Sequence, residues 1–183
     1  MCNMAKKWWI YAALALPFVV MVFLIGQNEN IRQNGQVFRF LIQPPYNEYK
    51  GNEDSYTRLV FANEKVVVKG FKPDWQESFY IQLQVDSAGF AMPVSASPNC
   101  KDGNNIKVTQ FGSSQDSLSY HIIDFRYGFD EFHLNQGKAK EVNMALRKAL
   151  TDGKSKAWME VRIKGCRAIP TGIFVDGKPL QYK

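Results

Sequence analysis

The most prominent pattern along the chain is an apolar run near its N-terminus, Trp8 to Ile25, which is eighteen residues long and carries no charge. A helix needs about 20 apolar residues to cross a hydrocarbon core of about 30 Å. Lys6 and Lys7 precede the run, and the next cation is Arg32. By the positive-inside rule this asymmetry predicts a cytoplasmic N-terminus and an exported remainder. We expect residues 8–25 to lie in the lipid bilayer as an uncleaved signal anchor.

Two other interpretations of the same run stay open. A cleavable signal peptide has a similar charged start and apolar stretch, but no small-x-small cleavage site follows Leu24. A buried core helix is not normally apolar on every face. The anchor interpretation divides the chain into a cytoplasmic tip, anchor and polar spacer over residues 1–34, and an extracytoplasmic domain over residues 35–183. It places a single-pass protein in the cytoplasmic (inner) membrane, with its domain in the periplasm or an equivalent extracytoplasmic space.

Beyond the run, the polar and apolar positions predict short strands. Residues 79–85 (FYIQLQV) alternate most clearly, with Phe79, Ile81, Leu83 and Val85 on one face. A long polar loop is expected over 95–105, and a hairpin turn over 112–116. Asp176-Gly177 is a strong tight-turn pair. The other predicted strands are 35–43, 56–62, 64–70, 90–94, 106–111, 118–125, 157–163 and 167–175.

One amphipathic helix is predicted in this region. Residues 138–150 (KAKEVNMALRKAL) place Val142, Ala145, Leu146 and Ala149 on one side at a spacing of about 3.6 residues. Gly153 is a suitable stop. Many short strands with one helix indicate a mainly β, β-rich α+β domain, an antiparallel sandwich or barrel-like structure, behind a single N-terminal transmembrane helix.

Composition narrows the class further. The chain has 183 residues, 45% of them hydrophobic and 22% charged, which is the mixture of one ordinary globular domain. With 13 Gly, 8 Pro and 3 Cys it is neither collagen-like nor a disulfide-dense scaffold. The net charge of +6 comes from scattered residues, and no basic stripe with interleaved aromatic residues is present. We therefore expect no nucleic-acid partner.

No catalytic or metal-binding constellation is evident. His121 and His133 have no ligand-spaced partner, so no metal or cofactor is expected. A Ser-Lys hydrolase would need an exposed serine beside a desolvated lysine. Ser55, Ser78 and Ser95 are the candidate nucleophiles, with the lysines of residues 65–69 as bases, but no motif selects a pair.

Cys100 and Cys166 are the two cysteines of the exported part. An oxidising compartment permits a disulfide between them. The other interpretation is that both are free, buried thiols. The distance between the two cysteines in the folded chain decides between a disulfide and free thiols.

Four residues of the segment 54–61 form a recognisable block: Asp54, Tyr56, Leu59 and Phe61. The block follows the predicted anchor and a predicted strand that begins with Gly35. In this order it resembles the motif that gives the GDYXXLXY family of bacterial membrane-anchored proteins its name. Tyr56 and Leu59 match, Phe61 replaces the last Tyr, and Asp54-Ser55 stands where the family has Gly-Asp.

Later segments follow the order of that family. Tyr127-Gly128 resembles its Tyr-Gly segment, Glu141 resembles the acidic residue that opens its helix, and Asp176-Gly177 resembles its closing hairpin. The resemblance carries over no established activity. It implies a partner in the membrane, because members of the family often accompany multi-spanning membrane proteins.

Together these observations predict a non-catalytic binding or accessory domain for a membrane or envelope protein. The alternative is an envelope hydrolase that uses an unrecognised Ser-Lys or carboxylate site.

Overall fold

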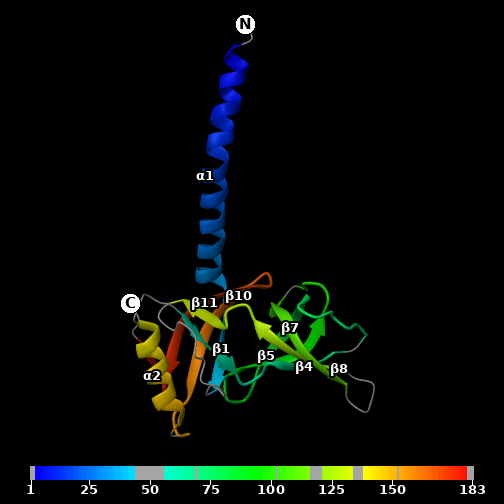
Figure 1. Ribbon diagram of the computed structural model, residues 1–183, viewed down its shortest axis with the longest axis vertical. Coiled ribbons are helices and arrows are strands. Elements are labelled where there is room, and N and C mark those ends of the chain that lie inside the picture. Colours follow the sequence, from blue (N-terminus) through cyan, green and yellow to red (C-terminus); the bar gives the residue numbers. More distant parts are fainter. Residues whose placement is uncertain are drawn as a thin grey trace.

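The computed structural model describes residues 3–43, 56–68, 70–101, 103–115, 121–133, 138–151 and 153–180. A long N-terminal helix, α1, rises like a rod from a strand-rich domain (Figure 1). The domain contains two antiparallel five-stranded sheets, a two-stranded pair and a second helix, α2. This confirms the predicted fold class, a mainly β domain with one amphipathic helix behind an N-terminal apolar helix.

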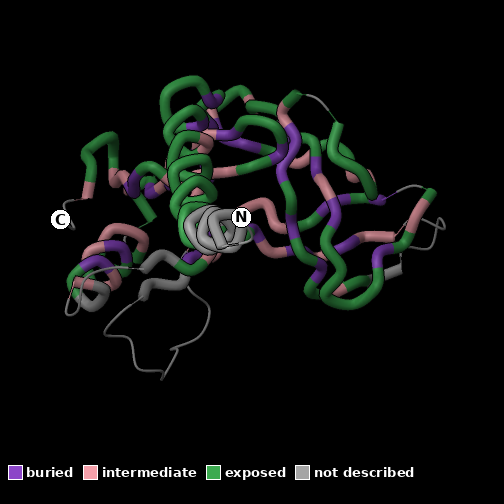
Figure 2. Tube along the Cα trace, turned by 90° about the horizontal axis from the view of Figure 1, so that it is seen from above, coloured by how far each residue is buried: buried purple, intermediate pink, exposed green. Residues whose placement is uncertain are grey.

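Helix α1 covers Asn3–Asn34. Its large apolar residues from Leu14 to Ile25 are exposed, and this part of the helix is coloured as exposed in Figure 2. Within the described residues it is the one helix long and apolar enough to cross a membrane, over Ala13–Asn34. Residues 27–34, the predicted polar spacer, continue this helix as far as Asn34.

The first sheet has the strand order β12-β11-β10-β1-β3. Every second residue of β1 and β10 points to one buried face, where Phe38 lies opposite Val161 and Phe40 opposite Met159. These strands alternate because their outer face is polar or amphipathic and their inner face is apolar. The strands are β1 (Gln36–Gln43), β3 (Val60–Phe61), β10 (Ala157–Lys164), β11 (Arg167–Val175) and β12 (Lys178–Pro179).

The second sheet, β4-β8-β7-β5-β6, is barrel-like, because its two edge strands β4 and β6 approach each other. Its strands are β4 (Lys65–Val68), β5 (Ser78–Val85), β6 (Ala91–Ser97), β7 (Asn105–Gln115) and β8 (His121–Tyr127). The predicted loop 95–105 is therefore shorter than expected. Strand β7 runs through the predicted turn at 112–116 as far as Gln115, past an irregularity between Gln110 and Gly112.

The segment 56–68 joins the sheets. The single strand predicted over 56–62 is wrong, because this stretch is divided between two partners. Strand β2 (Tyr56–Arg58) pairs with β9 (Glu131–His133), whereas β3 pairs with β1 and β4 pairs with β8. The Leu59 N–H donates to the carbonyl of Asp130, 2.7 Å away, and so extends the β2–β9 pairing.

Helix α2 covers Lys138–Thr151, as its 3.6-residue periodicity predicted. It buries Val142 and Leu146 against β2 and β10. These side chains join one continuous core that draws on both sheets. The two sheets therefore share a single hydrophobic core.

Candidate functional site

The best-defined built feature is the contact between α1 and the tip of the β10–β11 hairpin, which we call the helix–hairpin junction (α1 residues 27–34 and hairpin residues 162–167). The Arg167 guanidinium donates to the side-chain oxygen of Gln27 and to that of Asn28, the latter at 3.2 Å. Lys164 Nζ donates to Asn30 Oδ1 at 3.0 Å. Two cations of the hairpin therefore reach along the last two turns of the helix.

The junction also has an apolar and steric component. Ile31 is 4% exposed, the one buried side chain in an otherwise polar helical end. The helix ends where the Gly35 N–H donates to the Ile31 carbonyl, 2.8 Å away. A Cβ atom on Gly35 would meet that same carbonyl, and would lie 3.1 Å from the Cβ of Arg162. The backbones of α1 and β10 are thus in direct contact, and Arg162 Nη1 donates to the Gln33 carbonyl at 3.3 Å.

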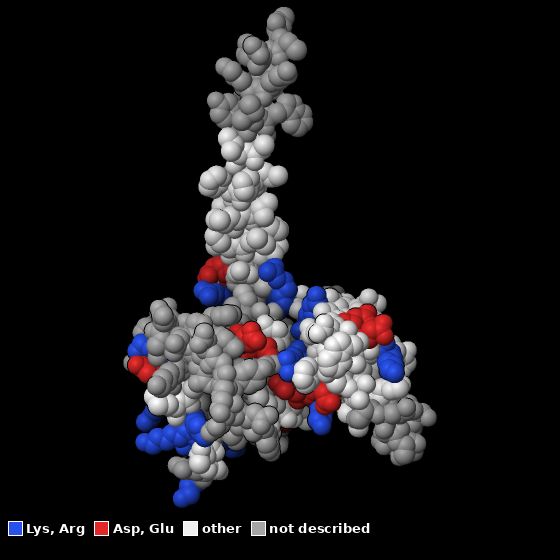
Figure 3. Space-filling view, viewed as in Figure 1, with Lys and Arg blue, Asp and Glu red and all other residues white. Residues whose placement is uncertain are grey.

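Positive charge gathers around this contact. The basic residues are Arg32 in the last turn of α1 and Arg162, Lys164 and Arg167 on the hairpin. The three hairpin cations donate to neutral side-chain amides and to a backbone carbonyl, so these bonds leave their charges uncompensated. The cations also complement the negative end of the helix dipole. Blue side chains lie around the base of the rod, with acidic side chains beside and below them (Figure 3).

The hairpin tip is held from a second side. Gly165 and Cys166 have φ values of 57° and 61°, the left-handed backbone that a two-residue type I′ turn requires. Cys166 forms a disulfide with Cys100, their Cα atoms 6.1 Å apart. Cys100 lies between β6 and β7, so the bond joins the tip of the first sheet to a loop of the barrel-like sheet. Of the two interpretations of these cysteines, the structure contains the disulfide.

Two of the family-like residues, Phe61 and Tyr127, lie in one aromatic cluster, and a third, Leu59, belongs to the same core. Leu59, Phe61 and Tyr127 are buried, and the rings of Phe61 and Tyr127 are 5.4 Å apart. The Tyr127 hydroxyl donates to the Asn63 carbonyl at 2.9 Å. Burial, together with the nearby Glu64 carboxylate, raises the pKa of Tyr127 far above its ordinary value. The phenol therefore stays protonated, and this cluster stabilises the core instead of forming a reactive site.

The other family-like residues do not join it. Gly128 is exposed, and Glu141 is exposed in the first turn of α2, where Lys138 donates to it at 3.0 Å. Asp176 and Gly177 form the turn between β11 and β12, with φ values of 48° and 82°. The Asp176 carboxylate accepts from the Lys156 N–H, and this bond lowers the pKa of Asp176. Asp54 lies outside the described residues, and Tyr56 is placed only through its backbone pairing with His133.

The candidate catalytic residues do not converge where the structure describes them. His121 begins β8 in register with Val68, and His133 ends β9. Ser78 is exposed on β5, and the Ser95 hydroxyl bonds to Gln82 Oε1 at 3.1 Å. Ser55 and Lys69 lie outside the described residues. Among the described residues, no three His, Cys, Asp or Glu side chains gather as metal ligands would.

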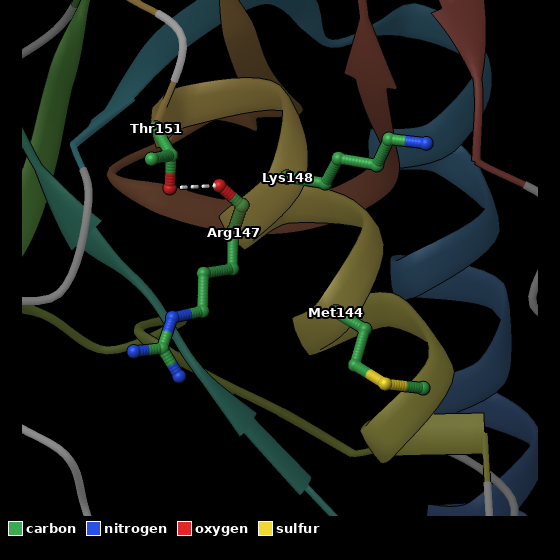
Figure 4. A pocket seen from close by; sticks show the side chains of 4 residues that line it. All are labelled: Met144, Arg147, Lys148 and Thr151. Carbon is green, nitrogen blue, oxygen red and sulfur yellow. Dashed lines mark hydrogen bonds between the residues drawn. The ribbon is translucent and has the colours of Figure 1, made fainter.

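A shallow hollow of about 340 Å³ lies on α2, lined by Met144, Arg147, Lys148 and Thr151. The side chains of Arg147 and Lys148 point in different directions, and Thr151 donates to the Arg147 backbone carbonyl at 2.6 Å (Figure 4). All four residues come from one helix. Because its polar groups do not aim at a common point, the hollow lacks the convergence of a ligand site.

Sequence reasoning did not select the junction residues. One signal was present: Ile31 is the only large apolar residue between Gly26 and Gly35, and at that position it marks a docked helical face. No pattern linked it to Lys164 or Arg167, which lie more than a hundred residues later. Comparisons of the chain with protein-family models, with curated proteins and with solved structures found no match.

Proposed function

We propose that this chain is a single-pass protein of the cytoplasmic membrane, with its N-terminus inside and its β domain on the extracytoplasmic side. In that position the domain acts as a non-catalytic binding or accessory module for another membrane or envelope protein. We also propose that the chain is related to the GDYXXLXY family, because of the matching residues quoted in the sequence analysis.

One observation carries the proposal. The exposed apolar surface of α1 runs without a helix break into polar turns that are bonded to the folded domain. Water disfavours an apolar rod of this kind, since about 25 cal/mol is lost for each Å² of apolar surface that stays wet. A bilayer removes that cost, and the junction then holds the domain at a set height and orientation above the lipid. Such mounting suits a protein that meets its partner at the membrane.

Two further features support the extracytoplasmic side. The Cys100–Cys166 disulfide is typical of oxidising compartments, and Lys6 and Lys7 precede the apolar run as the positive-inside rule expects.

The first test is fractionation of the native protein with intact-mass measurement. We expect a full-length mass in the membrane pellet after alkaline carbonate washing. We also expect protease to cut the domain when it is added on the extracytoplasmic side of intact membranes. A soluble species that has lost its first 25 or so residues would mean a cleaved signal and would overturn the anchor. Digestion only after the membrane is opened would overturn the orientation.

The second test addresses the partner. The full-length chain, tagged at its C-terminus, is cross-linked in intact cells and purified from solubilised membranes. The control bait is an unrelated single-pass protein with the same tag. A membrane or envelope protein enriched with the chain and absent from the control is expected. Recovery of identical proteins with both baits would argue against an accessory role.

A further inference from the structure

We propose that the tip of the β10–β11 hairpin lies in the lipid headgroup layer and binds the phosphates of anionic phospholipids through Lys164 and Arg167. The inference rests on the membrane anchor proposed above and assigns a lipid ligand to the helix–hairpin junction.

The height of the hairpin tip along α1 supports this position. The apolar run ends at Ile25, and a helix rises about 1.5 Å per residue. Gln27 and Asn28, which accept from Arg167, are therefore only about 3–5 Å beyond the end of the run. Asn30, which accepts from Lys164, is about 7.5 Å beyond it. Each headgroup layer is about 5–7.5 Å thick, so the acceptors of Arg167 lie within this layer and the acceptor of Lys164 lies at its outer edge.

The charge of this surface fits an anionic ligand. Lys164 and Arg167 are exposed, and both donate to neutral side-chain amides. Arg32 adds a third exposed positive charge, in the last turn of α1. Glu29 is the one acidic residue among α1 residues 27–34, and Gln33 donates to its carboxylate at 2.8 Å. Within the junction, Arg32, Arg162, Lys164 and Arg167 therefore outnumber the single carboxylate of Glu29.

The two cations also differ usefully in chemistry. A guanidinium can bind two phosphate oxygens at once, whereas an ammonium acts as a point charge. Their backbone is constrained, because the type I′ turn and the Cys100–Cys166 disulfide hold the tip and Gly35 holds the base. Because the hairpin backbone is already ordered, it loses little conformational entropy when a headgroup binds.

The test uses the full-length chain reconstituted in phosphatidylcholine bilayers. Spin-labelled phosphatidylglycerol and spin-labelled phosphatidylcholine report, by electron paramagnetic resonance, how strongly each lipid associates with the protein. We expect phosphatidylglycerol to be selected. Selection should fall about fivefold for each cation removed in K164Q and R167Q, and should weaken at high salt. Glutamine keeps a donor for the α1 amides, so the junction itself should persist in both variants.

Two controls make the result specific. The variant K154Q/K178Q removes the same charge at the far end of β10 and β11, about 25 Å from the tip. It should leave lipid selection unchanged. All variants are also measured in a K6Q/K7Q background, because those lysines face the opposite leaflet in the proposed topology.

Each other outcome overturns the inference. Selection that survives K164Q/R167Q in the K6Q/K7Q background would place the lipid contact elsewhere. If K154Q/K178Q lost as much phosphatidylglycerol selection as K164Q/R167Q, the selection would depend on net charge and not on the hairpin tip. A chain that resists carbonate extraction but selects neither lipid would overturn this inference alone, whereas a chain that carbonate extracts would overturn the anchor itself.

Discussion

Arg167 and Asn28 lie 139 positions apart, yet the guanidinium of one donates to the side-chain oxygen of the other at 3.2 Å. This bond joins the β10–β11 hairpin to the N-terminal helix α1. Ile31 and Gly35 bring the two backbones together beneath it. The helix and the domain are therefore packed as one unit.

Gly35→Ala should destabilise the junction. The added Cβ would meet the Ile31 carbonyl and lie 3.3 Å from the backbone nitrogen of Ile163, and backbone atoms cannot move aside cheaply. We expect a loss of about 1–3 kcal/mol in the free energy of unfolding, measured by denaturation of the full chain in detergent. Gly26→Ala is the matched control, because its Cβ meets nothing within 4 Å and alanine favours a helix. Equal losses in both variants would contradict the close approach at Gly35.

Reducing the Cys100–Cys166 disulfide should cost about 4 kcal/mol, the chain-entropy value for a loop of this length. Denaturant titrations with and without reductant measure the difference. The oxidised chain should show one reactive thiol, Cys2, and the reduced, unfolded chain three. Cys2→Ser serves as the control, since it should leave both the stability and its response to reductant unchanged.

Tyr127→Phe should cost about 1–3 kcal/mol, because the Asn63 carbonyl loses its buried donor. The two proteins should also differ in alkali. The pKa of Tyr127 in the folded chain lies above its unfolded value of 10.0. Above pH 10 the unfolded chain therefore releases the phenol proton while the folded chain keeps it. The stabilisation that the phenol gives the fold is complete below pH 10 and is lost as the pH rises further. Unfolding curves between pH 8 and pH 11 test this. An equally steep alkaline loss in the phenylalanine variant would contradict it.

Asp176→Ala should lower the melting temperature more than Asp176→Asn. Asparagine tolerates the left-handed φ of 48° and keeps an acceptor for the Lys156 N–H, whereas alanine supplies neither. The pKa of Asp176 is lowered, so the carboxylate stabilises the fold above its unfolded pKa, and this contribution is lost as the pH falls through the folded pKa. Melting curves from pH 7 down to pH 2 provide the measurement. Identical melting temperatures for the two variants would contradict a stabilising role of Asp176 in this turn.

Local pattern was sufficient for several elements. The alternation of β5, the 3.6-residue period of α2 and the Asp176-Gly177 turn are properties of a few neighbouring residues. The apolar run of α1 is equally local, because hydrocarbon thickness alone sets the length that it needs. These elements were therefore predictable from the sequence.

Three elements depended on distant partners. The segment 56–62 is apolar enough for one strand, but β9 and β1 each take part of it. Strand β7 continues past Gly112 because β8 pairs with it as far as Gln115. Residues 27–34 look like a spacer, and they stay helical in contact with the β10–β11 hairpin.

The sequence by itself determined that a strand-rich domain follows an apolar helix, since periodicity and apolar length act over short stretches of chain. Only the tertiary structure decided that Cys100 meets Cys166, and that Lys164 and Arg167 reach the end of α1. Distances between residues so far apart in the chain follow from how the sheets pack, which no local pattern encodes.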